Sequence, residues 1–207
     1  MALLTYSDLV TAIQTNWLNR ATDTQLTTVV GDLITLGEKR IYRKLRVRQM
    51  ESTFSSTVDG SGSVALPTDY ADLKFAYVSR APVQWLERKP TQWLYTNYPY
   101  RASNTGLPKF ISRDASSFVF GPQPDSSYLI NGTYYAKPAA LSTAVNAVFT
   151  ANPELFLFAA LCEAEPWLSN DERIPVWEKK YAQILMDVQQ ESDAENVSGG
   201  VLAATVG

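Results

Sequence analysis

Hydrophobic residues recur with two different periods along this chain, and the changes of period divide it into three parts. Before residue 50 and after residue 150, large apolar residues return every three or four positions, as on one face of an α-helix. Between Met50 and Pro138 the pattern changes to short runs rich in β-branched and aromatic residues, separated by turn-forming residues. This order of patterns predicts an α+β fold.

The first part predicts two helices, over residues 5–19 and 23–45. Thr5 and Asp8 have the spacing of a capping box, which places a helix start at Thr5. Gly37 lies on the apolar face of the second helix. Glycine is unfavourable inside a helix, so we explain it by the close approach of another helix at this position. That face carries Leu26, Val30, Leu33, Ile34, Gly37, Ile41 and Leu45.

The last part predicts two more helices, over residues 153–168 and 170–191. The earlier one is apolar on nearly every side up to Glu163, which is typical of a helix buried among others. We therefore expect a helical bundle of about four helices, with a β-rich insertion between its second and third helices and an extended C-terminal tail. The expected boundaries are 1–49 with 150–190 for the bundle, 50–149 for the insertion and 191–207 for the tail.

Six of the eighteen basic residues fall within ten positions near the end of the second predicted helix: Lys39, Arg40, Arg43, Lys44, Arg46 and Arg48. They are interpreted as a solvated helix end, placed favourably at the negative end of the helix dipole, or as a surface for acidic protein partners. A nucleic-acid groove is the alternative.

The charge is divided unevenly along the chain. Residues 1–150 have a net charge of +4, from 15 basic and 11 acidic residues, whereas residues 151–207 have a net charge of −7, from 3 basic and 10 acidic residues. This division favours contacts between the two parts, within one fold or between copies.

Several functional classes are disfavoured by composition. The chain has no histidine and one cysteine, Cys162, which excludes an intrachain disulfide and makes a zinc site an improbable prediction. We expect no metal, no cofactor, no membrane contact and, because no signal peptide is recognisable, a product made in the cytosol. A glycan hydrolase needs two converging carboxylates. Glu163 and Glu165 are two positions apart and do not share a helix face, so we expect no enzyme activity.

Five aromatic residues fall within residues 85–100: Trp85, Trp93, Tyr95, Tyr98 and Tyr100. Three interpretations stay open. Such residues pack a small sheet against a helix, anchor a subunit interface, or form a platform for a sugar.

The order of several stretches resembles the adaptor proteins, or head-to-tail connectors, of short-tailed phages, the tail tubular A or neck adaptor class. These stretches are TYSDLVTAIQTNWLNR, LITLGEKRIYRKLRVRQMEST, ALPTDYADLKFAYV and YYAKPAALS, followed by NPELFLFAALCEAEPWLSNDERIPVWEKKYAQIL. The resemblance covers roughly residues 3–190. No single motif carries it, since none is a catalytic signature.

The resemblance implies a structural subunit of a dodecameric ring in the virion neck, made in the host cytoplasm. Such a ring joins the portal protein to the tail nozzle or tail tubular protein and continues the channel through which the genomic DNA passes. It would place the six basic residues at a protein interface and Trp85, Trp93 and Tyr98 at contacts with a neighbouring subunit or the nozzle. The tail would be a portal-binding arm: Asn196, Val197, Ser198, Gly199, Gly200, Val201, Leu202, Ala203, Ala204, Thr205, Val206 and Gly207. The alternative function is a DNA-binding module that uses residues 39–48.

Overall fold

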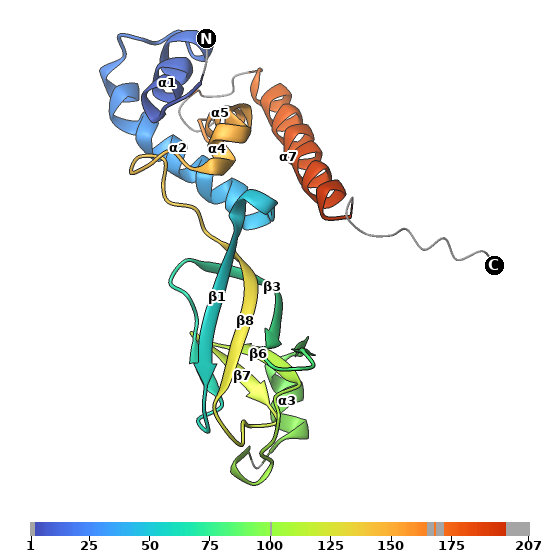
Figure 1. Cartoon of the computed structure of the whole chain (residues 1–207). Coiled ribbons are helices and arrows are strands. Elements are labelled where there is room, and N and C mark those ends of the chain that lie inside the picture. The colour runs from blue at the N-terminus through green and yellow to red at the C-terminus, as the bar shows by residue number, and fades with distance from the viewer. Residues whose placement is uncertain (1–2, 100, 165–167, 169–171, 198–207) are drawn as a thin grey trace, which may run out of the picture. The chain divides into compact units, whose positions relative to one another are not determined.

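The computed structural model describes residues 3–99, 101–164, 168 and 172–197 (Figure 1). The chain divides into two compact units. The helical unit combines residues 1–50 with residues 138–207, and the β unit consists of residues 51–137.

The helical unit begins with α1 (Tyr6–Thr11), which continues as the π-helical turn η1 (Ala12–Trp17). The predicted capping box is confirmed. The backbone N–H of Asp8 donates to Thr5 Oγ1 at 3.1 Å, and the backbone N–H of Thr5 donates to Asp8 Oδ2 at 2.9 Å. These bonds satisfy two of the N–H groups that a helix start leaves without partners.

The longest helix of the first segment is α2 (Thr24–Lys44), and its predicted apolar face is buried as expected. Gly37 lies where α2 meets another helix: a Cβ added there would be 2.9 Å from the backbone nitrogen of Ala160. The close approach predicted from the sequence is therefore confirmed. Gly31, for which the sequence offers no reason, faces the Tyr6 hydroxyl, which would lie 3.1 Å from an added Cβ.

Three further helices complete the helical unit: α4 (Ala147–Ala151), α5 (Pro153–Cys162) and α7 (Ile174–Val197). The apolar helix α5 packs against both α2 and α7, as Figure 1 shows. The short 3-10 helix η2 (Arg48–Met50) ends the first segment of this unit. None of the helices described is long and apolar enough to cross a membrane.

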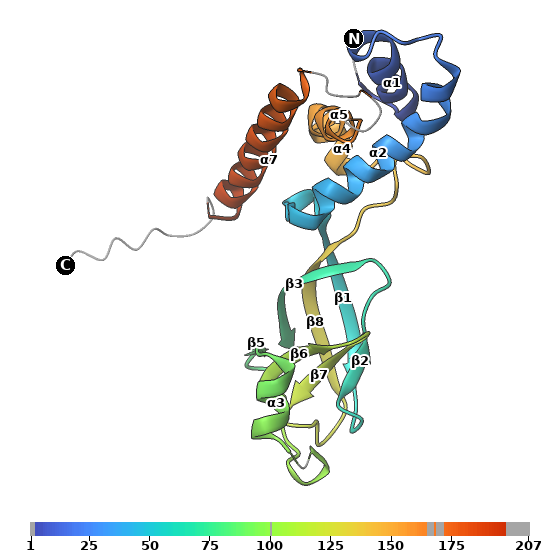
Figure 2. The ribbon, with the colours of Figure 1, turned by 180° about the vertical axis from the view of Figure 1, so that it is seen from behind.

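The β unit contains two four-stranded sheets (Figure 2). The first sheet is antiparallel, with the order β1 (Glu51–Val58), β8 (Tyr128–Ala136), β3 (Tyr70–Val78) and β4 (Gln84–Trp85). The second has the order β2 (Ser63–Ala65), β7 (Ser117–Gly121), β6 (Phe110–Asp114) and β5 (Glu87–Arg88), with β5 parallel to β6. The neighbours β1 and β2 belong to different sheets, and so do β4 and β5.

The two sheets share one hydrophobic core, to which both contribute large buried side chains. Phe54 of β1 stacks on Phe118 of β7, with ring centroids 5.6 Å apart. Tyr70 of β3 meets the same ring edge-on at 5.4 Å. The short helix α3 (Thr91–Asn97) packs beside β6 and β7, and the 3-10 helix η3 (Arg101–Ser103) follows it.

These observations correct the expected architecture. The fold is α+β, but the prediction of a helical bundle of about four helices with a β-rich insertion is wrong. The described residues form six α-helices and two sheets, and the strands form a large core of their own. The expected extended tail is also wrong over residues 191–197, which continue α7. Ser192 explains part of this extension, because its side chain is buried and bonded to the first segment of the unit.

Candidate interaction site

Arg40 is one of two residues in the basic group whose side chains are engaged within the helical unit. Its guanidinium, on α2, bonds Glu163 at the end of α5 at 3.1 Å and both carboxylate oxygens of Glu178 on α7 at 2.6 and 2.8 Å. The same guanidinium lies 4.8 Å from the ring centroid of Tyr181. Burial alone would lower the pKa of Arg40, but the bonds and charge of Glu178, with Glu163, raise it above its ordinary value. Arg40 therefore stays charged and joins α2, α5 and α7.

Arg46 is also occupied within the chain. It lies just beyond the end of α2, and its guanidinium donates to the carbonyl oxygens of Tyr42 at 2.9 Å and Leu45 at 2.6 Å. A cation at this position satisfies carbonyls that the end of a helix leaves free and is stabilised by the helix dipole. The sequence predicted a solvated helix end that includes Arg46, whereas in the structure its side chain is partly buried and bonds the carbonyl oxygens of that end.

The backbone that follows α2 is held by side chains of α7. The amide of Gln189 accepts the N–H of Arg46 and donates to its carbonyl oxygen, both at 3.0 Å. Two residues later, the N–H of Arg48 donates to Ser192 Oγ at 3.0 Å. Neither Gln189 nor Ser192 was singled out from the sequence, because their partners lie more than 140 positions away.

The other four basic residues of the group, Lys39, Arg43, Lys44 and Arg48, have exposed side chains. In the described part of the chain none of these side chains forms an ion pair. Lys39 and Arg43 lie one turn apart on α2, opposite the buried Ile41, and Leu36 on the same face is 44% exposed. The structure thus separates the six predicted interface residues into two that are used internally and four that are exposed.

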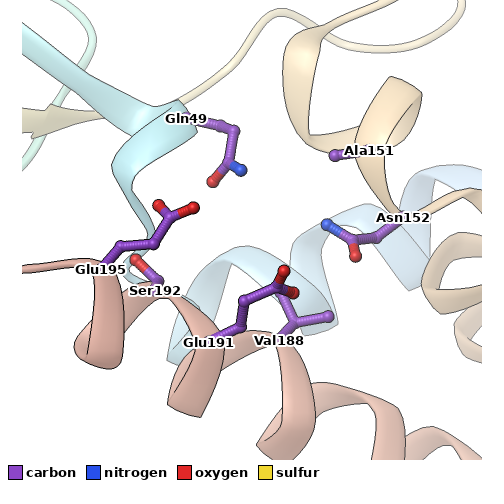
Figure 3. A pocket seen from close by; sticks show the side chains of 7 residues that line it. All are labelled: Gln49, Ala151, Asn152, Val188, Glu191, Ser192 and Glu195. Atoms are coloured by element: carbon purple, nitrogen blue, oxygen red, sulfur yellow. The ribbon is translucent and has the colours of Figure 1, made fainter. Parts of the chain in front are cut away.

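A small polar pocket lies where the end of α7 meets η2 and the start of α5 (Figure 3). Its volume is about 110 Å³. Figure 3 shows that side chains from these separate segments point into one space. The lining residues are Gln49, Ala151, Asn152, Val188, Glu191, Ser192 and Glu195. The i, i+4 spacing of Glu191 and Glu195 is the only sign of this pocket in the sequence.

The aromatic residues singled out from the sequence differ in exposure. Trp85 on β4 is 60% exposed and forms one aromatic cluster with Phe75 and Tyr77 of β3, at centroid distances of 5.7 and 5.5 Å. Trp93 and Tyr98 instead contact Phe110 of β6, at 4.8 and 6.3 Å, and so pack α3 on its own sheet. Trp85 is therefore the exposed member of the predicted trio, and Phe75 and Tyr77 were missed.

The predicted C-terminal arm is described only at its start. Asn196 and Val197 end α7, and residues 198–207 of the predicted arm lie outside the described residues.

Cys162 is buried, and burial raises the pKa of its thiol to about 12, so it stays protonated at neutral pH. Glu163 is paired with Arg40, and Glu165 lies outside the described residues. Among the residues described, no group of three or more acidic or cysteine side chains is placed to hold a metal ion.

Exposed cations, an acidic pocket and an exposed aromatic cluster are features of a protein that contacts other macromolecules. The family model described as SU10 adaptor protein matches residues 4–203 of the chain. The chain therefore belongs to the SU10 adaptor protein family. It is a phage adaptor protein, a structural component of the virion that associates with other virion proteins. A search of curated proteins found no match.

Proposed function

We propose that this chain is a subunit of a closed ring, of twelve copies, that joins the portal to the tail nozzle of a short-tailed phage. In this proposal the ring continues the channel for the genomic DNA, which passes without specific binding. The observation that carries the proposal is membership of the adaptor family over residues 4–203, almost the whole chain. The family match includes most of the residues assigned to the C-terminal arm.

The proposal gives different roles to different parts of the chain. Residues 196–207 form the arm that binds the portal. This segment has too few large apolar residues to build a core of its own, so it becomes ordered on contact with the portal. The exposed cations Lys39, Arg43, Lys44 and Arg48 lie at a protein interface, where charge sets register. Trp85 contacts a neighbouring subunit or the nozzle, because an exposed aromatic residue is a common anchor at interfaces. Trp93 and Tyr98, which pack on Phe110, are the other two residues assigned to this contact.

The rival function is a DNA-binding module that uses residues 39–48. Arg40 and Arg46, two of the six cations it would use, are already engaged within the helical unit. A channel lined by strongly binding cations would also oppose DNA passage, since phosphate contacts weaken only as salt rises. These arguments favour the protein interface.

The test is the solution mass of the purified chain, alone and mixed with its portal protein, measured by light scattering. A matched variant ends at Val197, so that α7 keeps all of its described residues. The proposal expects twelve full-length chains on each portal and a loss of docking for the shortened chain. Equal docking of the shortened chain would move the portal contact to the folded units. A full-length chain that ignores the portal and binds DNA in a salt-dependent way would overturn the ring proposal.

A further inference from the structure

One face of α2 carries two exposed cations. Lys39 and Arg43 are exposed and, within the residues described, form no ion pair. Leu36, on the same face one turn earlier, is 44% exposed. The opposite face of α2 packs on α5. A helix face with two cations and one apolar residue therefore remains available to a partner.

The polar pocket at the end of α7 has the complementary chemistry. Figure 3 shows the carboxylates of Glu191 and Glu195 and the amides of Gln49 and Asn152 directed into it. Carboxylate and amide oxygens accept hydrogen bonds, and Ser192 Oγ already accepts the N–H of Arg48. A volume of about 110 Å³ admits the end of one long side chain but not a folded segment. The pocket therefore matches a guanidinium or ammonium group.

The spacing of the charges matches as well. Lys39 and Arg43 are four residues apart on α2, and Glu191 and Glu195 are four residues apart on α7. In both helices this separation is about 6 Å along the axis. Arg43 can therefore approach Glu191, with Lys39 one turn away, when α2 of one copy lies along the end of α7 of another.

We propose that the pocket lined by Glu191 and Glu195 receives Arg43 from a second copy of this chain, with Lys39 of that copy one turn away. Arg43 is chosen for the pocket because a planar guanidinium has five donors in a fixed arrangement and can bond a carboxylate and an amide oxygen together. The donor face and the pocket are different surfaces of one chain, so each copy offers one of each. Such a heterologous contact, repeated around a closed rotation, produces a ring. This inference rests on the proposed function, which requires contacts between identical copies.

The test uses sedimentation velocity of the full chain, alone and with the portal protein. Arg43→Glu and Glu191→Arg are each expected to weaken association between copies about tenfold or more, because each places like charges together. An equimolar mixture of the two variants is expected to associate again. When the two variants alternate, one kind of contact joins the changed residue of one variant to the changed residue of the other. The other kind joins the unchanged Arg43 to the unchanged Glu191, so every contact pairs opposite charges. Lys109→Glu, a charge change of the same sign and size as Arg43→Glu at an exposed site of the β unit, is the control and is expected to associate normally.

The outcomes separate this inference from the proposed function. If the wild-type chain associates in neither condition, the ring proposal and this inference both fail. If wild type associates and both charge variants associate equally well, the ring stands and the pocket contact is wrong. If Arg43→Glu alone fails and the mixture does not recover, the α2 face binds a different partner. Recovery of the mixture supports contact between copies, because a contact within one chain cannot be restored by mixing.

Discussion

Glu38 on α2 accepts a hydrogen bond of 2.9 Å from the backbone N–H of Leu141, a residue 103 positions later in the chain. The Glu38 side chain is 5% exposed. One turn further along α2, the Tyr42 hydroxyl accepts a bond from the Asn146 amide at 3.1 Å. These two contacts hold the segment before α4 on the helix. Burial raises the pKa of Glu38, although the Leu141 N–H opposes this shift.

The first prediction concerns Glu38. Because its pKa is raised in the folded chain, the stabilisation it contributes is complete below its ordinary value near 4.5. That stabilisation is lost as the pH rises through the raised value. Glu38→Gln keeps an acceptor for Leu141 and cannot ionise. The thermal midpoint of this variant minus that of wild type should therefore increase as the pH is raised from 4 to 7.

The matched variant for this site is Glu38→Ala. It leaves the buried N–H of Leu141 without its acceptor, which costs roughly 1–3 kcal/mol of unfolding free energy. Hydrogen exchange at the Leu141 amide should accelerate in Glu38→Ala and stay slow in Glu38→Gln. A difference between Glu38→Gln and wild type that does not change with pH would contradict the assigned role of ionisation.

The second prediction concerns Arg40. Arg40→Ala leaves the carboxylates of Glu163 and Glu178 beside each other without their cation. Because Glu178 is 43% exposed and partly screened by solvent, we expect a loss of about 1–2 kcal/mol, measured by urea unfolding. Arg40→Lys keeps the charge but cannot bond Glu163 through one nitrogen and Glu178 through another, so its loss should be intermediate. Equal stability of wild type and Arg40→Ala would show that packing and the hydrogen bonds of Gln189 and Ser192 hold α7 in the unit without help from the Arg40 ion pairs.

The third prediction compares two glycines of α2. Gly37→Ala would place a Cβ against the backbone of Ala160 and Ala159 and separate α2 from α5, a loss of roughly 1–3 kcal/mol. Gly31→Ala meets only the end of the Tyr6 side chain, which can rotate. It should leave stability unchanged or raise it by up to about 1 kcal/mol, because alanine favours a helix. The thermal unfolding midpoints of both variants test this prediction. A lower midpoint for Gly31→Ala than for Gly37→Ala would contradict it.

The fourth prediction concerns Gly132 of β8. An added Cβ would lie 2.5 Å from Phe54 Cε1 and 2.6 Å from the backbone oxygen of Phe75. Gly132→Ala should therefore destabilise the β unit by roughly 1–3 kcal/mol. Shortening Phe54 to leucine in the same chain should not restore stability, because the clash with the backbone of β3 remains. The control is Gly60→Ala, where no atom lies within 4 Å of the added carbon. Near-ultraviolet circular dichroism during heating measures both variants.

The sequence predicted the parts of the fold that depend on neighbours along the chain. The Thr5–Asp8 capping box, the apolar face of α2 and the close approach at Gly37 all follow from periodicity and local bonding. The exposure of Lys39 and Arg43 opposite Ile41 follows from the same helical period. The order of these stretches was also enough for the resemblance to phage adaptors.

Only the tertiary structure decided which distant residues meet. The alternating runs of the middle segment do not say that β1 pairs with β8 while β2 pairs with β7, because strand pairing depends on partners far along the chain. For the same reason the sequence did not reveal that these strands form a core of their own.

Charge patterns have the same limit. Six cations near residue 40 are alike in sequence, yet Arg40 alone of them forms ion pairs among the described residues. Its partners Glu163 and Glu178 come into reach only because α5 and α7 pack against the rest of the helical unit. Local period determines which side of a helix is polar, whereas packing across the chain determines which of its charges are paired and which remain for a partner.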